Sequence, residues 1–222
     1  METLELNKVS CVLCTVTESR EQQQLLLKAR DLFMRIGIRS VSMDDIAREL
    51  GISKKTLYQL VENKEGLVEQ VLEADTCRDL ETLNRNREES ADAIDEFLRN
   101  SRYFIRQMRE MSPTAMHDLR KYYPELFHNQ IKAHQHEFHR GVAANLERGM
   151  REGLYREDLD AEVIANLYVG MTMMVIDRGV FPAQERPLSE ILLQQSTYHF
   201  NGVVNAVGRD RLEHYLKQEQ LA

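Results

Sequence analysis

The segment from Ser42 to Tyr58 constrains the fold of this chain more than any other part of it. Ser42 can cap one short helix, Gly51 can make a tight turn, and Ser53 can cap a second short helix. Ala47 is small where two helices must approach each other closely. This pattern is typical of a helix-turn-helix, whose second helix enters the major groove of DNA.

The remainder of the chain also has helical periodicity. Between Leu25 and Ile36 apolar residues recur at spacings of three and four, which gives one apolar stripe. With 4 Pro and 10 Gly in 222 residues, the chain is poor in turn formers, which disfavours a β-sandwich. We therefore expect an all-α protein of about nine helices. Beyond residue 80, helices are predicted over 94–108, 124–150, 160–178 and 187–207.

The charge pattern suggests three segments. Residues 20–66 carry 9 basic and 7 acidic side chains, whereas the whole chain has a formal net charge of −7. One slightly basic segment on an acidic protein indicates a local DNA-facing surface. We predict an N-terminal extension over residues 1–19, a three-helix DNA-binding domain over 20–66, and a helical ligand-binding and dimerisation domain over 67–222.

Residues from about 24 to 71 resemble the TetR family of bacterial transcriptional regulators. The resemblance rests on residues in the family's order and spacing: Gly37, Ser42, Ile46-Ala47, Gly51-Ile52-Ser53-Lys54, Thr56-Leu57-Tyr58 and Lys64-Glu65-Gly66-Leu67. Val61 stands where the family usually has an aromatic residue, and Glu62 where a basic one is frequent. The resemblance implies a homodimer with an N-terminal DNA-binding domain and a C-terminal domain for ligand and dimer contacts.

Seven polar side chains are candidates for contacts with double-stranded DNA. Lysine can donate to guanine, glutamine can pair with adenine, and threonine can meet the thymine methyl group. The candidates for base edges are Lys54, Lys55, Thr56 and Gln59, and the candidates for phosphates are Ser42, Tyr58 and Lys64. Arg39 could reach the backbone or the minor groove. The alternative is that these lysines form an ordinary solvated face.

The C-terminal two thirds of the chain suggest an effector pocket. Methionine is adaptable and suits a pocket for apolar ligands, and aromatic rings can add walls with polar tips. Plain core packing explains the same helical stripes. The predicted pocket residues are Tyr103, Phe104, Met108, Met111, His134, Phe138, Tyr168 and Met171.

Two apolar helices near the C-terminus predict a dimer interface. Two such helices from each subunit can pair about a two-fold axis as a four-helix bundle. Burial inside one subunit is the alternative. The predicted interface residues are Val163, Leu167, Met174, Ile191, Gln195, Tyr198 and Val203.

Several classes of site and location are disfavoured. No phosphate-binding glycine loop, nucleophile elbow or HExxH motif is present, so an enzyme is not expected. Neither the histidines near His134 nor the three cysteines have a complete ligand spacing, so we expect no metal and no cofactor. Three cysteines are too few for a disulfide framework. No apolar run reaches the roughly 18 residues of a membrane span, and we expect a cytoplasmic protein without membrane contact.

These features predict a DNA-binding transcriptional regulator. The expected form is a homodimeric repressor that a small, largely apolar effector releases from a palindromic operator. A protein of the same fold that acts as an interaction partner or coactivator, and senses no small molecule, is the alternative.

Overall fold

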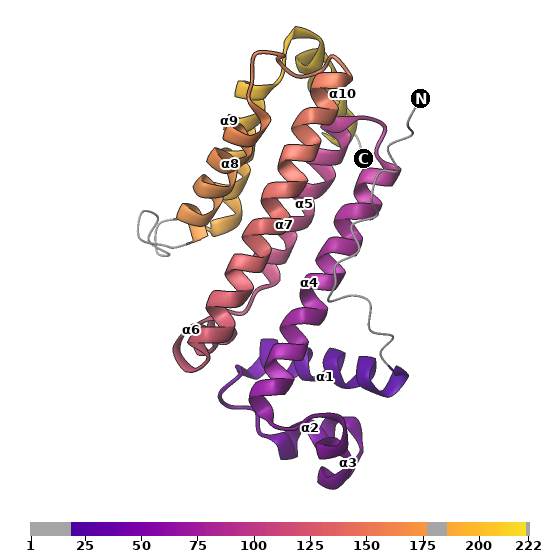
Figure 1. Ribbon diagram of the computed structural model, residues 1–222, viewed down its shortest axis with the longest axis vertical. Helices are drawn as coiled ribbons and strands as arrows, with labels where there is room; N and C mark the ends of the chain where they lie inside the picture. The colour runs from indigo at the N-terminus through magenta and orange to yellow at the C-terminus, as the bar shows by residue number, and fades with distance from the viewer. Residues whose placement is uncertain (1–18, 177–185, 221–222) are drawn as a thin grey trace. The chain divides into compact units, whose positions relative to one another are not determined.

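The computed structural model describes residues 19–176 and 186–220. This part of the chain forms ten helices, coloured in chain order in Figure 1. The all-α prediction is confirmed, and the described residues contain ten helices where about nine were expected. The helices are α1 (Arg20–Ile36), α2 (Met43–Leu50), α3 (Lys54–Leu60), α4 (Lys64–Glu89), α5 (Ala93–Glu110), α6 (Pro113–Tyr122), α7 (Pro124–Arg151), α8 (Ala161–Ile176), α9 (Leu188–Val203) and α10 (Ala206–Gln220).

The chain divides into two compact units. Among the described residues, the first contains 19–84 together with 111–133, and the second contains 85–110 together with 134–176 and 186–220. Both α4 and α7 therefore contribute residues to each unit. The predicted division at residue 66 stays a prediction. The predicted N-terminal extension lies outside the described residues, apart from Ser19, whose side chain caps α1.

The first unit has a core built by short helices that are well capped. Helix α1 packs against both α2 and α6, and α2 packs against α3. The apolar stripe predicted between Leu25 and Ile36 supplies the centre of this core, because its inward side chains have almost no exposed surface. The most deeply buried members of the core are Leu25, Ala29, Val41, Ile46, Leu57, Leu67 and Val68.

Helix α6 lies tightly against the turn between α1 and α2. Gly37 ends α1 at φ 96° and ψ 148°. A Cβ atom there would lie 2.9 Å from both Asp118 Oδ2 and Thr114 Cγ2, so only glycine fits. Asp118 Oδ2 also accepts a hydrogen bond from the Arg39 backbone N at 2.8 Å. Residues about 80 positions apart in the sequence are thereby joined within the first unit.

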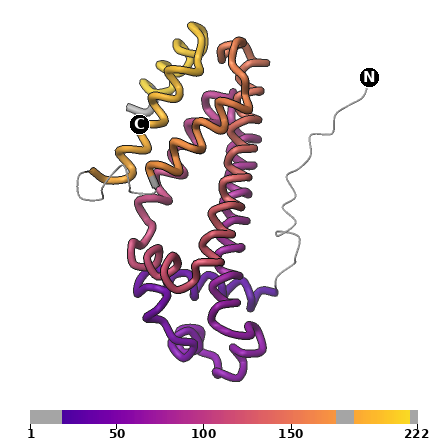
Figure 2. The backbone as a smooth tube through the Cα atoms, turned by 60° about the vertical axis from the view of Figure 1, so that its left-hand side comes forward, coloured from indigo at the N-terminus to yellow at the C-terminus, as the bar shows by residue number. Residues whose placement is uncertain are grey.

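The second unit combines the end of α4, α5, the later part of α7, α8, α9 and α10. Helix α9 packs against α5 and α8, and α10 packs against α5; the tube in Figure 2 shows α8 and α9 side by side. Its core includes Phe97, Leu146, Tyr155 and Phe200. None of the described helices is long and apolar enough to cross a membrane.

A buried ion pair joins the helices of the second unit. Arg148 Nη1 donates to Glu96 Oε2 at 2.8 Å and to Ser90 Oγ at 2.7 Å, while its Nε donates to Glu152 Oε1 at 2.7 Å. The Glu96 side chain is almost fully buried. A buried carboxylate is tolerated only when it is paired and hydrogen-bonded, and Arg148 meets both conditions.

Candidate nucleic-acid interface

Local hydrogen bonds fix the first helix of the helix-turn-helix. Ser42 Oγ accepts from the Asp45 backbone N at 3.2 Å, and Asp45 Oδ2 accepts from the Ser42 backbone N at 2.9 Å. This reciprocal pair is a capping box, which satisfies two donors at the start of α2. Gly51 ends α2 in the left-handed conformation at φ 68°. The predicted cap and the predicted turn are therefore both present.

The second short helix, α3, presents a polar face to solvent. Ser53 Oγ accepts from the Thr56 backbone N at 3.0 Å and begins the helix. Leu57 points inward with 0% exposure, whereas Tyr58 on the same helix is 45% exposed. The exposed side chains of α3 are Lys54, Lys55, Thr56, Tyr58 and Gln59. These are the residues that sequence spacing placed on the outward face.

The polar residues of α3 differ in whether they already have a partner. Lys54 Nζ lies 2.8 Å from Asp44 Oδ1, and the hydrogen bond and charge of Asp44 raise the pKa of Lys54. The Thr56 hydroxyl lies 2.8 Å from Ser53 Oγ. Lys55 and Gln59 form no hydrogen bond or ion pair with any other described residue. These two side chains are therefore available to an incoming ligand without breaking an existing contact.

The candidate phosphate contacts gather where α2 and α4 begin. Lys64, at the start of α4, is half-buried and donates from Nζ to the Arg39 backbone O at 3.3 Å. Burial lowers the pKa of Lys64. Ser42 is exposed at the start of α2. Backbone N–H groups at helix starts attract anions, so this corner of the first unit suits a phosphate.

Most of the predicted pocket residues meet in the second unit. Phe104 lies with its ring centre 5.7 Å from that of Tyr103 and 5.1 Å from that of Phe138. The Phe138 ring centre lies 5.7 Å from that of Tyr168. Of the other predicted residues, Met108, His134 and Met171 are half-buried residues of this unit, whereas Met111 belongs to the first unit.

Two ring neighbours in this cluster were not among the predicted site residues. The His199 ring lies 4.2 Å from the Tyr168 ring and 5.5 Å from the Phe97 ring, centre to centre. Burial lowers the pKa of His199 from 6.5 to about 4, so its imidazole is neutral at pH 7. A sequence signal existed, because His199 stands between apolar positions of a predicted helix, but helical position alone does not identify its ring partners.

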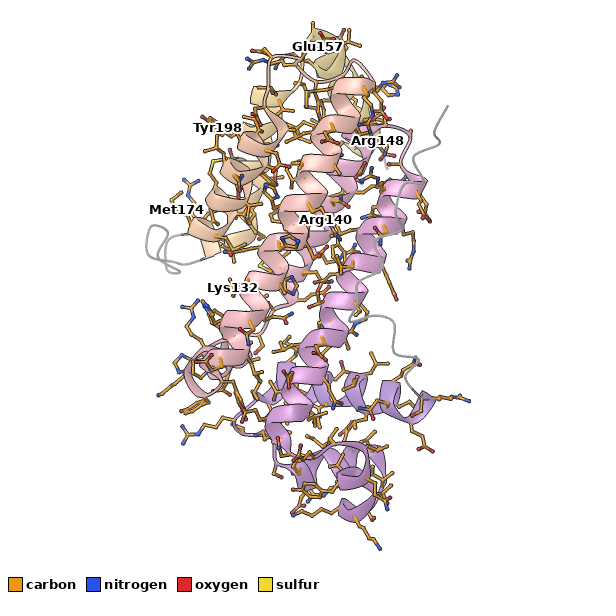
Figure 3. All side chains as sticks on the ribbon, viewed as in Figure 1. Lys132, Arg140, Arg148, Glu157, Met174 and Tyr198 are labelled. Carbon is orange, nitrogen blue, oxygen red and sulfur yellow. The ribbon has the colours of Figure 1, made fainter. Side chains whose placement is uncertain are left out.

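The predicted dimer residues differ in how exposed their side chains are. Val163, Leu167, Met174 and Tyr198 are exposed on α8 and α9, with Tyr198 the most open at 74%, and Leu193 is exposed as well. Figure 3 labels Met174 on α8 and Tyr198 on α9. Ile191 is half-buried. In contrast, Val203 is buried and so is Gln195, which donates from Nε2 to Thr172 Oγ1 at 2.7 Å. Gln195 and Val203 therefore pack inside the subunit, as the alternative interpretation allowed.

The described residues contain no candidate metal site. Over residues 19–176 and 186–220, no three His, Cys, Asp or Glu side chains come together as a metal site would require. Cys77, on α4, is disulfide-bonded, which the count of three cysteines did not predict. The interpretation of Cys11 and Cys14 falls outside the described residues.

Two capped short helices joined by a left-handed glycine, with an exposed polar second helix, define a helix-turn-helix DNA-binding protein. Comparison with known families agrees, because residues 25–71 match the bacterial regulatory proteins of the tetR family. Residues 25–71 are therefore similar to the DNA-binding domain of that family.

Solved structures share the fold over most of the chain. A transcriptional regulator from Cytophaga hutchinsonii has a TM-score of 0.73 at 15% identity, covering 84% of this chain and 100% of that one. A TetR-family regulator from Streptomyces coelicolor has a TM-score of 0.62 at 22% identity, covering 83% and 97%. The fatty acid degradation regulator FadR from Bacillus halodurans has a TM-score of 0.61 at 15% identity, covering 83% and 96%. A comparison with curated protein sequences gave no match.

Proposed function

We propose that this regulator acts as a homodimeric repressor that binds a palindromic operator through α3 and leaves it when a small, largely apolar effector binds. The observation that carries the proposal is the division of the α3 side chains between the core and solvent. Leu57 anchors the helix in the core, while Lys55, Tyr58 and Gln59 are exposed. A rigid helix with an outward polar face suits insertion into the major groove.

Some side chains of α3 contact base edges, and others contact phosphates and position the helix on the DNA. Lys55 donates to guanine and Gln59 pairs with adenine, while the Thr56 methyl group meets thymine. Lys54 reads a base only after it leaves Asp44, which lies 2.8 Å away. Tyr58 contacts a phosphate from α3, and Ser42 and Lys64 do so from the starts of α2 and α4.

An exposed apolar face on α8 and α9 supports a two-fold dimer. Val163, Leu167 and Met174 lie on α8 at spacings that place them on one side of a helix, and all are at least 44% exposed. Leu193 and Tyr198 add apolar surface from α9, which packs beside α8. An uncovered apolar surface of this kind marks an interaction site. A second copy provides the same helices, and the four pack as a bundle.

The aromatic cluster of the second unit supports an apolar effector. Phe104, Phe138 and Tyr168 stand close together, and half-buried Met108 and Met171 can adapt to a ligand's shape. An effector releases DNA only if it binds the DNA-free conformation more tightly than the DNA-bound one. Residues 67–222 therefore carry both effector binding and dimerisation, and the regulator acts in the cytoplasm, as the sequence predicted.

A gel-shift assay on the DNA upstream of the protein's own gene tests this function. Wild-type protein is expected to retard the fragment, and a Lys55→Ala, Tyr58→Ala double variant is not, because both substitutions remove exposed contacts of α3. The matched control is Lys132→Ala, which removes an exposed lysine from α7. A normal shift by the double variant would overturn the assignment of α3, and absence of any shift by folded wild type would overturn the proposed function.

A further inference from the structure

The C-terminal end of α6 presents basic side chains close to an aromatic ring. Asp118 is the only acidic residue of α6, and it is buried against the Arg39 backbone N. The exposed charged residues of the helix are Arg120 and Lys121, both in its last turn. The last turn of this helix therefore presents two basic side chains and no acidic one to solvent, in a protein whose formal net charge is −7.

Two cationic side chains lie close to the exposed ring of Tyr122. The Arg39 guanidinium lies 4.5 Å from the centre of the Tyr122 ring and also donates a hydrogen bond to the Tyr122 hydroxyl. Lys121 Nζ lies 5.3 Å from the same ring centre. Such contacts hold the cationic groups in place without neutralising them. Two positive charges thus share one small area of the first unit.

This basic area continues directly into the proposed DNA interface. Lys64 Nζ donates to the Arg39 backbone O at 3.3 Å, so the phosphate candidate at the start of α4 adjoins the α6 cluster. Ser42, a further phosphate candidate, follows Arg39 by three residues in the same turn. The chain of contacts runs from the helix-turn-helix through Arg39 to Tyr122, and all of it belongs to one unit.

We propose that Arg39, Lys121 and Tyr122 form a second phosphate-binding surface, which we call the α6 patch, and that it holds the DNA backbone beside the half-site read by α3. This inference rests on the proposed DNA binding and adds a contact made by a helix outside the helix-turn-helix. Each cation brought to a backbone phosphate releases a counterion, so the patch adds affinity without sequence preference.

The basic residues also have a local role that the test must separate from phosphate binding. Cations in the last turn of a helix stabilise its negative end. Loss of Lys121 could therefore weaken DNA binding by loosening α6, with no phosphate involved. The two explanations differ in their dependence on DNA length, because a lost backbone contact matters only when the DNA extends to the patch.

The test compares a short and a long DNA duplex. The probe is the palindrome that the wild-type dimer selects from a random-sequence pool, alone or extended on each side by one helical turn of about 10 base pairs. Fluorescence anisotropy at a series of salt concentrations gives the slope of log affinity against log salt for the wild type and for Lys121→Gln. Lys132→Gln, an exposed lysine of α7 in the same unit, is the charge-matched control.

The expected result is confined to the long duplex. On the long duplex, Lys121→Gln lowers the magnitude of the slope of log affinity against log salt by about 2 per dimer. One phosphate contact is lost from each of the two subunits, and each contact contributes about 0.9 to the slope. From 50 to 200 mM salt, the affinity advantage of the wild type then shrinks by about 10-fold. Binding of the short duplex is unchanged, and Lys132→Gln matches the wild type on both duplexes. Tyr122→Phe, which keeps the ring and removes the hydroxyl, shows a smaller loss of the same kind.

Every other outcome overturns the α6 patch. Equal slopes for wild type and Lys121→Gln on both duplexes exclude a phosphate contact, and equal losses on both indicate a structural effect on α6. If the wild type binds and Lys55→Ala weakens both duplexes, but Lys121→Gln has the same salt slope as the wild type on both, the proposed function stands while the patch fails. If the wild type selects no DNA, both proposals fail together.

Discussion

At the scale of single residues, two neighbouring lysines of α3 have different electrostatic states. Lys54 Nζ lies 2.8 Å from Asp44 Oδ1, whereas Lys55 is exposed with no such partner among the described residues. A base contact by Lys54 must therefore replace an existing ion pair. The sequence identifies both lysines as outward-facing, but Asp44 is ten positions earlier, and only the packing of α2 on α3 brings it near.

The first prediction compares alanine substitutions at these two lysines. Lys55→Ala is expected to weaken operator binding about 10-fold or more, since a good base contact contributes about 1–3 kcal/mol. Lys54→Ala is expected to have the smaller effect, because Asp44 already offsets its charge. Anisotropy titrations at fixed salt measure both. A larger loss for Lys54→Ala than for Lys55→Ala would contradict this ranking.

The second prediction concerns His199 and acid stability. Its folded-state pKa of about 4 lies below the unfolded value of 6.5, so the unfolded chain binds the proton more readily. The stability that this residue contributes is complete above pH 6.5 and falls as the pH drops towards 4. Over that window the wild type should lose about 3 kcal/mol through this residue alone.

Urea unfolding at several pH values checks that loss against His199→Phe, which keeps a ring between Phe97 and Tyr168 and does not titrate. As the pH falls from 6.5 to 4, the unfolding free energy of the wild type should decrease more than that of the variant. His117→Gln, at an exposed histidine of α6, should follow the wild type. A gap that is constant with pH would contradict burial of a neutral His199.

At the scale of elements, local signals predicted some helices and missed others. The capping box of Ser42 and Asp45 is visible in the sequence because both partners lie within four residues. Helix α6 was not predicted, because the expected helices ended at 108 and began again at 124. Ser112 Oγ in fact accepts from the Ala115 backbone N at 3.3 Å, and Pro113 occupies the first helical turn, which is also a start signal.

The break between α9 and α10 depends on contacts distant in the sequence. Val204 is extended and forms an isolated antiparallel bridge with Tyr155. The Asn205 backbone N donates to the Leu154 backbone O at 3.1 Å, and Asn205 Oδ1 accepts from the Gly208 N at 2.9 Å. Because the bridge partners are about 50 residues earlier, apolar periodicity alone gave one continuous helical region to residue 207.

The third prediction compares two glycines that end helices of the first unit. Gly37→Ala is expected to destabilise by about 2–3 kcal/mol, because its backbone conformation is nearly exclusive to glycine and Asp118 and Thr114 fill the space. Gly51→Ala is expected to cost about 1 kcal/mol, because φ is 68° but no atom lies within 4 Å of the added Cβ. Thermal and urea unfolding measure both, and equal costs would contradict the close approach of α6.

At the scale of the whole molecule, the sequence predicted the DNA-binding element better than the sites of the second unit. Residues 25–71 form a local motif whose caps and turns are encoded within a few positions. The second unit instead assembles side chains from distant segments, such as Phe104, Phe138 and Tyr168. Met111, a predicted pocket residue, lies in the first unit, and Gln195, a predicted interface residue, is buried within the subunit.

The fourth prediction tests the proposed dimer. Leu167→Glu is expected to dissociate the protein into monomers at micromolar concentration, because it places a charge in the centre of the exposed apolar face of α8. Leu216→Glu, at an exposed leucine of α10, is the matched control and should remain dimeric. Analytical ultracentrifugation distinguishes the two. A dimeric Leu167→Glu variant would place the interface elsewhere.

In the proposed dimer, two copies of this chain hold two α3 helices for adjacent half-sites, and footprinting can detect this arrangement on DNA. Hydroxyl-radical footprints of the purified protein on the DNA upstream of its own gene should show a protected palindrome. Its half-site centres should lie about one helical turn, 10–10.5 base pairs, or a multiple of it apart. Protection of one unpaired half-site, or none by folded protein at any salt concentration, would contradict a dimeric DNA-binding regulator.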